Sequence, residues 1–445
     1  MNACDQYFPT IMQPVRCGVV LTVLCAVTVF IAPRAKADEF VGQHFELHLS
    51  DLPAPYHAPA NLVSAKDVER DDDWVPRVPP GFHVGIFATG LDRPRELAIA
   101  PSGVVFVSQT HEGDVVALRD DDGDGIADTR TVFADEFREP TGLAVQDNAL
   151  FVADRRAVWR IAFDGDAMKP GARTMVTRPG ALGEGGGHIT REIVFTRDGK
   201  HFFVSIGSET DTGEDPWPRS TIQKFRTDGH AQETFASGLR NPVGLALYPG
   251  TDNLYAVVNE RDGLGAGLVP DYLTRIEEDA FYGFPYAYLG SHPDPQFGDI
   301  RPDLVKTTKA PDLLFKPHSV PLGLLFYRGK GFPAGFRGDA IVAMHGPQKA
   351  GGVGISLVRV HFHDGRPQGG YETFMTGFGA DMPHTAGKDD TESAALQVWG
   401  RPVWIAEASD GALLVSDDVA NVIWRVTWEG PSAANEAKLP AAPRH

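Results

Sequence analysis

A short pattern that recurs six times is the feature that most constrains how this chain can fold. Each copy has one or two polar residues, usually a proline, a small or acidic residue and then an apolar run. The copies begin, in chain order, at Arg93, Glu139, His188, Arg240, His318 and Arg401. Units that recur every few tens of residues are typical of repeat folds, because one unit cannot bury its apolar faces alone.

Short apolar runs follow each copy and are separated by turns that contain Gly or Asp. Examples are Pro101-Ser-Gly-Val-Val-Phe-Val and Val422-Ile-Trp-Arg-Val. Such runs are rich in β-branched and aromatic residues, and no long helical periodicity accompanies them, which indicates an all-β protein. We therefore expect a six-bladed β-propeller of mostly four-stranded antiparallel blades.

The repeats also suggest domain boundaries. The propeller is expected over residues 81–430, after a Pro- and Asp-rich surface extension over 38–80 and before a flexible Ala/Pro-rich tail over 431–445. The longest gap between repeats, Asp262 to Pro317, is expected to be a loop-rich insertion.

The first 37 residues are interpreted as a signal peptide. An apolar run from Gly18 to Pro33 follows Arg16, and Ala35-Lys36-Ala37 is a pattern that signal peptidase accepts. The alternative is an uncleaved anchor, but the run is short for a span of about 20 residues. We expect cleavage after Ala37, a periplasmic or secreted protein, and no stable membrane insertion.

Cysteine usage and charge narrow the possible partners. All three cysteines, Cys4, Cys17 and Cys25, lie in the leader, so the mature chain would have no disulfide, thiolate metal site or haem attachment motif. The net charge is −18 and no basic tract is present, which argues against a nucleic-acid partner.

Residues just before the innermost strands of a propeller meet at one mouth of the central channel. Here that geometry gathers arginines, histidines and an amide, which suits an anionic ligand with a base beside it. His188 follows three glycines, and a neutral imidazole can remove a proton from a hydroxyl.

An acidic turn matches the first part of a calcium-binding loop. Its oxygen-bearing residues alternate as Asp120, Asp122, Asp124 and Asp128 around Gly125. Thr131 stands where the bidentate Glu would be, so the turn is either a structural calcium site or a solvated acidic turn.

Longer motifs resemble the glucose/sorbosone dehydrogenase family, and most closely its L-sorbosone dehydrogenase-like branch. The resemblance covers roughly residues 80–428. The motifs are Gly187-His-Ile-Thr-Arg-Glu-Ile-Val-Phe, Gly238-Leu-Arg-Asn-Pro-Val-Gly-Leu-Ala, Asn259-Glu-Arg-Asp, Tyr282-Gly-Phe-Pro-Tyr, His318-Ser-Val-Pro-Leu-Gly-Leu and Gly400-Arg-Pro-Val.

The resemblance implies a propeller that binds pyrroloquinoline quinone and calcium and oxidises a sugar-like alcohol or aldehyde. His188 would be the general base that takes the hydroxyl proton. The residues implied to contact the quinone are Arg240, Asn241, His318, Ser319, Lys349 and Arg401. Calcium would be held by backbone oxygens near Arg261 and Asp262, with Glu260 or Asp271 nearby.

Four departures from the soluble glucose dehydrogenases in that family argue against glucose as the substrate. Gly187 replaces the Asp before the base, Ser208 replaces an acidic residue, Val403 replaces an arginine, and Arg261-Asp262 replaces the Gly-Pro of the calcium loop. These changes leave full quinone affinity open.

Two other functions therefore remain open. The first is a calcium-dependent lactonase-like hydrolase, which would need side-chain carboxylates and amides around an axial metal. The second is a non-catalytic ligand-binding propeller. A dehydrogenase of this kind, without haem, would need an external electron acceptor such as a cytochrome or a quinone.

Overall fold

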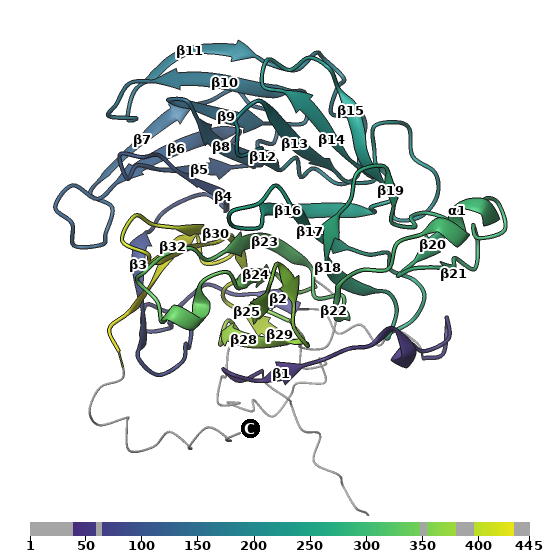
Figure 1. The fold of residues 1–445 in the computed structure, drawn as a ribbon. Helices are drawn as coiled ribbons and strands as arrows, with labels where there is room; N and C mark the ends of the chain where they lie inside the picture. Colours follow the sequence, from purple (N-terminus) through teal and green to yellow (C-terminus); the bar gives the residue numbers. More distant parts are fainter. Residues whose placement is uncertain (1–38, 59–64, 348–353, 380–395, 431–445) are drawn as a thin grey trace, which may run out of the picture. The chain divides into compact units, whose positions relative to one another are not determined.

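The computed structural model describes residues 39–58, 65–347, 354–379 and 396–430. Within them, six antiparallel sheets follow one another along the chain, each with at least four strands, and the predicted six-bladed β-propeller is confirmed (Figure 1). The predicted leader and tail, and Lys349, lie outside the described residues. No helix among the described residues is long and apolar enough to cross a membrane.

The first three blades are continuous in sequence. Blade 1 contains β4 (Pro94–Ile99), β5 (Val105–Gln109), β6 (Asp114–Arg119) and β7 (Thr129–Ala134). Blade 2 contains β8 (Gly142–Gln146), β9 (Ala149–Ala153), β10 (Val158–Phe163) and β11 (Pro170–Met175). Blade 3 contains β12 (Ile193–Phe195), β13 (His201–Ile206), β14 (Thr221–Arg226) and β15 (Glu233–Ser237), to which β19 (Ala280–Phe281) adds in parallel.

The last three blades recruit distant segments. Blade 4 contains β16 (Asn241–Leu247), β17 (Leu254–Asn259), β18 (Pro270–Ile276) and β22 (Leu313–Pro317). Blade 5 contains β23 (Pro321–Phe326), β24 (Ala340–Met344), β25 (Ser356–Val360) and β28 (Tyr371–Met375), edged by β1 (His44–Phe45). Blade 6 contains β30 (Pro402–Glu407), β31 (Leu413–Asp417), β32 (Val422–Trp428) and β3 (Phe82–Ala88).

The ring closes through strands from both ends of the propeller. β3 pairs antiparallel with β32, in a register that places Phe82 opposite Trp428 (Figure 1). The innermost strands β4, β8, β12, β16, β23 and β30 contact one another in that order, and β30 contacts β4. The six repeats of the sequence each lead into one of these innermost strands.

Glycines allow the innermost strands to approach closely around the axis. A Cβ atom at Gly142 would lie 1.9 Å from the carbonyl oxygen of Arg191, and one at Gly244 would lie 2.3 Å from that of Leu322. These distances are too short for any side chain, so the repeats keep glycine here. Val243, Leu322 and Val403 fill this part of the core.

The remaining elements are short. They are the strands β2 (Ala65–Asp67), β20 (Ala287–Tyr288), β21 (His292–Pro293), β26 (Phe362–His363), β27 (Arg366–Pro367) and β29 (Leu396–Val398), the helix α1 (Pro302–Thr307) and the 3₁₀ turns Leu49–Asp51 and Ala334–Phe336. The expected insertion is less irregular than its composition suggested, because β18 and β22 within it complete blade 4.

Candidate active site

A cavity of about 790 Å³ lies where the segments before three innermost strands converge. His188 precedes β12, Arg240 and Asn241 stand at the start of β16, and His318 precedes β23. All four side chains line the cavity. Its volume is in the range that holds small molecules and cofactors in other proteins, about 300–1,000 Å³.

His188 is held in one tautomer by Ser208, which follows β13. Its Nδ1 lies 3.0 Å from the Ser208 carbonyl oxygen and 2.9 Å from the Ser208 Oγ. The Ser208 hydroxyl donates its own proton to the Thr210 carbonyl, at 2.6 Å. Both oxygens near Nδ1 are therefore acceptors, so Nδ1 carries the ring proton and Nε2 keeps a free lone pair.

The surroundings of His188 also keep its ring neutral. Burial, followed by the positive charge of Arg240, lowers the pKa of His188 to about 4. A ring that is neutral at physiological pH, with an unprotonated Nε2, can accept a proton from a bound hydroxyl group.

Arg240 links the wall that carries His188 to the opposite wall. Its guanidinium forms an ion pair with Asp211 and donates to the carbonyl oxygens of Asn259, at 3.2 Å, and Glu260, at 2.8 Å. The Arg240 carbonyl in turn accepts from the Ser208 amide at 2.7 Å. These bonds fix the part of the cavity lining that lies between blades 3 and 4.

Several buried polar atoms of the cavity lack hydrogen-bond partners among the described residues. They are Asn241 Oδ1, Asn259 Oδ1, Glu260 Oε1 and His318 Nε2. Asn241, Asn259 and Glu260 are each at least nine-tenths buried. Buried polar atoms are almost always satisfied in folded proteins, so this cluster indicates that a polar ligand completes the site.

His318 and Asp262 form a pair that was not predicted as such. The His318 Nδ1 lies 2.8 Å from the Asp262 Oδ1, and this hydrogen bond raises the pKa of His318. His318 has a φ of +63°, which is unusual for a residue with a side chain. Strained backbone of this kind is concentrated at functional sites.

Two carboxyl groups of this wall are almost completely buried. Burial raises the pKa of Glu260 to about 7 and that of Asp271 to about 6. Asp271 accepts hydrogen bonds from the Glu260 and Val320 amides, both at 2.8 Å. Among the described residues, neither carboxyl group has an ion-pair partner within 4 Å, so each could ionise more easily beside a bound cation.

The other predicted residues are placed differently. Arg261 forms a buried ion pair with Asp294. Ser319 is buried and donates to the Lys316 carbonyl at 2.6 Å. Arg401 is also buried; it donates to the His345 carbonyl at 2.8 Å and the Gly346 carbonyl at 3.1 Å. None of these three side chains lines the cavity.

The predicted calcium loop forms a tight acidic turn between β6 and β7. Asp120 accepts from the amides of Gly123, at 2.7 Å, and Gly125, at 2.9 Å. The carboxylates of Asp120, Asp122 and Asp124 offer oxygens within 4.8 Å of one another, whereas Asp128 accepts from the Asp121 amide at 2.8 Å. The geometry is compatible with either of the two interpretations of this turn.

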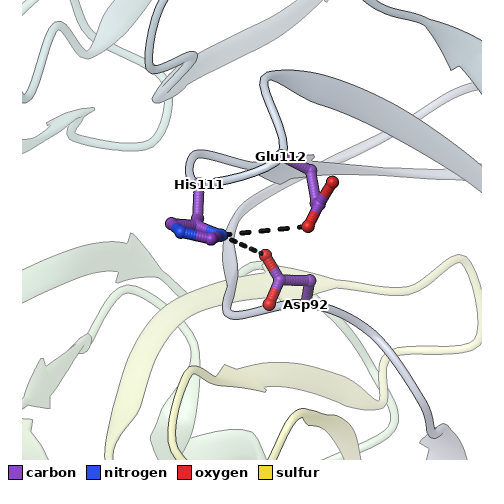
Figure 2. A group of neighbouring side chains, drawn as sticks. All are labelled: Asp92, His111 and Glu112. Carbon is purple, nitrogen blue, oxygen red and sulfur yellow. Dashed lines mark hydrogen bonds and ion pairs between the residues drawn. The ribbon is translucent and has the colours of Figure 1, made fainter.

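Sequence reasoning missed several residues near this face of the propeller. Arg95, within β4, lines the cavity and pairs with Asp418 at 2.8 Å. Figure 2 shows a second, exposed cluster, in which the His111 Nδ1 lies 3.2 Å from Asp92 and 3.8 Å from Glu112. Asp92 follows β3 and the other two follow β5, so no local motif joins them.

These features define a six-bladed propeller with an axial cavity in which the neutral His188 faces several unpartnered polar side chains. Residues 76–285 match the family model described as TrAA12-like. An uncharacterised protein of Borreliella burgdorferi is 27% identical over 369 residues, which are 79% of this chain and 91% of that protein. The aldose sugar dehydrogenase YliI of Escherichia coli is 25% identical over 33% of this chain and 43% of its own length.

Solved structures share the fold. The holo form of the pyranose dehydrogenase PQQ domain from Coprinopsis cinerea has a TM-score of 0.65 and 18% identity, over 82% of this chain and all of that one. The PQQ-bound aldose sugar dehydrogenase from Streptomyces coelicolor has a TM-score of 0.54 and 18% identity, over 79% of this chain and all of that one. These structures confirm the fold, and the family model and the relatives agree with the predicted resemblance to soluble sugar dehydrogenases; the sorbosone branch stays a prediction.

Proposed function

We propose that this protein is a quinone- and calcium-dependent oxidoreductase that removes a hydride from a sugar-like alcohol or aldehyde. The observation that carries the proposal is the pairing, in one cavity, of a neutral histidine with a wall of unpartnered polar atoms. The names of the similar proteins, which include PQQ-bound sugar dehydrogenases, support the same chemistry.

The cavity fits pyrroloquinoline quinone, a flat polar molecule with three carboxylates. Arg95, Arg240 and His318 bring cationic or protonatable groups to its lining. The unpartnered oxygens of Asn259 and Glu260 are of the type that calcium prefers. When bound, the quinone supplies the hydride acceptor and calcium acts on it as a Lewis acid.

The chain itself supplies the base and the positioning groups. His188 accepts the substrate hydroxyl proton at Nε2, while Nδ1 stays bonded to Ser208. Arg240 and Asn241 hold the anionic cofactor, and Glu260, with Asp271 behind it, balances the charge of the cation. Arg401 acts indirectly, since its bonds to His345 and Gly346 fix the segment that brings Pro347 to the cavity.

The cellular setting is part of the proposal. We expect an exported protein that passes its electrons to a separate acceptor, a cytochrome or a quinone. The cysteine-free chain after residue 37 suits an exported domain that relies on a large core rather than on disulfides.

One observation favours a second candidate, a calcium-dependent lactonase-like hydrolase. That function needs side-chain amides and carboxylates around an axial metal, and Asn241, Asn259 and Glu260 provide them. Arg95 and Arg240 favour the quinone instead: each already pairs with an aspartate, but both guanidinium groups line the cavity, and a lactone carries no charge for them to bind.

Reconstitution with quinone and calcium separates the two. The full chain should reduce a dye when aldoses are added, and should not hydrolyse lactones with calcium alone. His188→Gln should lower kcat by roughly 10²–10⁴-fold, the usual contribution of a general base, while quinone binding persists. His230→Gln is the matched control, because His230 lies on an exposed turn of the same blade. Lactone turnover without quinone would support the hydrolase. An unchanged kcat in His188→Gln would contradict the role of His188 as general base.

A further inference from the structure

The loop that leads to His188 has an unusual backbone. Gly183, Gly185 and Gly187 all have positive φ, between +73° and +95°, and they alternate with Glu184 and Gly186, which do not. A positive φ at every second residue turns successive peptide groups so that polar atoms gather on one side, as in the ion-binding concavities of other loops. Here carbonyl oxygens of every second residue face the same two guanidinium groups.

Arg219 binds the middle of this row of carbonyls. Its Nη1 donates to the oxygens of His188 and Gly207, both at 3.1 Å, and its Nη2 donates to those of Glu184, at 3.3 Å, and Gly186. Arg219 therefore joins the backbone of His188 to the end of β13, where Ser208 holds the imidazole ring.

Arg191 binds the two ends of the same row. Its Nε donates to the Leu182 carbonyl at 3.0 Å, and its Nη1 donates to those of His188, at 3.0 Å, and Thr190, at 2.8 Å. Each of the carbonyls of residues 182, 184, 186, 188 and 190 thus accepts a hydrogen bond from Arg191 or Arg219. The carbonyl of His188 accepts from both.

Neither arginine forms a direct ion pair among the described residues: Arg191 is fully buried and Arg219 nearly so, and the carboxylates that act on them, such as Glu209 on Arg219, do so without a contact within 4 Å. Burial, and then the charge of Arg219, lowers the pKa of Arg191 to about 9. Burying two cations that repel each other is costly, and the hydrogen bonds that they donate to the loop carbonyls offset this cost.

Packing alone would leave this loop poorly supported. The 790 Å³ cavity lies against Gly187 and His188, and a second cavity of about 410 Å³ lies against Gly180, Gly183 and Gly185. A loop with open space on two sides and few side chains gains its order from hydrogen bonds to its backbone.

We propose that Arg191 and Arg219 are positioning residues that orient the general base. Their guanidinium groups bind a row of carbonyl oxygens whose arrangement suits a cation. This inference rests on the proposed function of His188. It predicts that the arginines control how well His188 acts, and not how tightly the quinone binds.

The test compares Arg219→Ala and Arg219→Lys with Arg359→Lys in the full chain reconstituted with quinone and calcium. Arg359 is the control, since its side chain is also largely buried, at 14% exposed, but it lies on β25 of blade 5 and pairs with Asp339 and Glu372. Arg219→Ala should lower kcat by roughly 10–100-fold at unchanged quinone affinity, because a displaced base is far less effective. Millimolar guanidinium should restore part of the loss, and Arg219→Lys should fall between wild type and Arg219→Ala.

A second measurement does not depend on turnover. Selective ¹³C labelling of histidine Cε1, with His188 assigned through His188→Gln, reports the titration of the base. Loss of Arg219 should raise the pKa of His188, because a neighbouring positive charge is removed and the ring reaches water. If Arg219→Ala does not fold, Arg219→Lys carries the comparison instead: lysine keeps the charge but reaches fewer carbonyls, so the rise in the pKa of His188 should be smaller and should come only from exposure of the ring to water.

The outcomes separate the two proposals. A folded Arg219 variant with wild-type kcat and an unchanged His188 titration overturns the positioning role. If the wild type itself has no turnover, the proposed function fails, and the His188 titration alone then decides whether the arginines orient the ring. An equal loss of kcat in Arg359→Lys would show a general loss of stability and would also overturn the inference.

Discussion

The two walls of the axial cavity differ in how fully their polar groups are satisfied. On the wall from blade 3, His188 is fixed through its ring, its amide and its carbonyl oxygen. On the wall from blades 4 and 5, Asn259, Glu260 and His318 each keep a buried polar atom without a partner. The polar atoms that hold His188 in place are satisfied before any ligand arrives, whereas these three on the other wall are not.

This difference separates two roles. A base must be oriented in advance, because small errors in position cost rate. A binding wall can keep polar atoms unsatisfied, provided that the ligand satisfies them later, but the empty protein is then less stable than it could be. Substitutions in the two walls should therefore have opposite effects on the stability of the empty protein.

Glu260→Gln should give the largest change and tests whether the unsatisfied wall binds calcium at a cost in stability. Loss of the carboxylate should weaken calcium binding by at least roughly tenfold, since a charged ligand is removed. The same change should raise the melting temperature of the empty protein at pH 8, because a buried charge disappears. Calorimetric calcium titrations and thermal melts measure the two effects.

The matched control for this prediction is Glu278→Gln, an exposed glutamate beside Lys224. It should leave both quantities unchanged. A Glu260→Gln protein that melts at a lower temperature than wild type and binds calcium normally would contradict the contrast between the walls.

The pH dependence of calcium binding should be the next largest effect. The pKa of Glu260 is raised to about 7 and that of Asp271 to about 6 by burial, whereas the unfolded chain loses these protons near pH 4. The empty folded protein thus holds protons that the unfolded chain lacks. The stability that they contribute is complete below about pH 4 and is lost as pH rises through 7.

Calcium prefers the ionised carboxylates, so its affinity should rise over the same pH window, with release of protons. Thermal melts from pH 5 to 8, with and without calcium, should show a stabilisation by calcium that grows with pH. A stabilisation that is constant, or larger at pH 5, would show that these carboxyl groups do not hold the cation.

Ser208→Ala should give the smallest effect, on the opposite wall. It removes one of the two acceptors of the His188 Nδ1 proton and leaves the Ser208 carbonyl, so kcat should fall by roughly 2–10-fold, the worth of one hydrogen bond. Calcium affinity should not change. Steady-state kinetics beside Ser50→Ala, an exposed serine, give the comparison, and a lower calcium affinity in Ser208→Ala would mean that the walls are not separate.

The sequence predicted the part of the site that its repeat encodes. His188, Arg240, Asn241 and His318 occupy equivalent positions before innermost strands, so the propeller symmetry brings them together. Arg401 has the same position in its repeat, but its guanidinium binds carbonyls of blade 5 instead. A repeat fixes where a Cα atom lies and not where a long side chain points.

Other parts of the site could not be predicted from spacing. Asn259 stands at the end of β17, outside the repeat, and Arg95 lies two residues after the start of its copy, within β4, so neither holds the repeat position that marked the other residues. The contacts of Arg219 with the loop before His188 span about 31 residues of sequence and involve only backbone acceptors, which carry no residue-type signal.

The central claim is that the two walls bind one quinone between them. Equilibrium dialysis of the empty full chain with pyrroloquinoline quinone tests it most directly. We predict calcium-dependent uptake of one quinone per chain, and loss of that uptake in a variant that combines Arg240→Leu with Glu260→Leu. No uptake by the wild type, or uptake that persists in the folded double variant, would contradict the account.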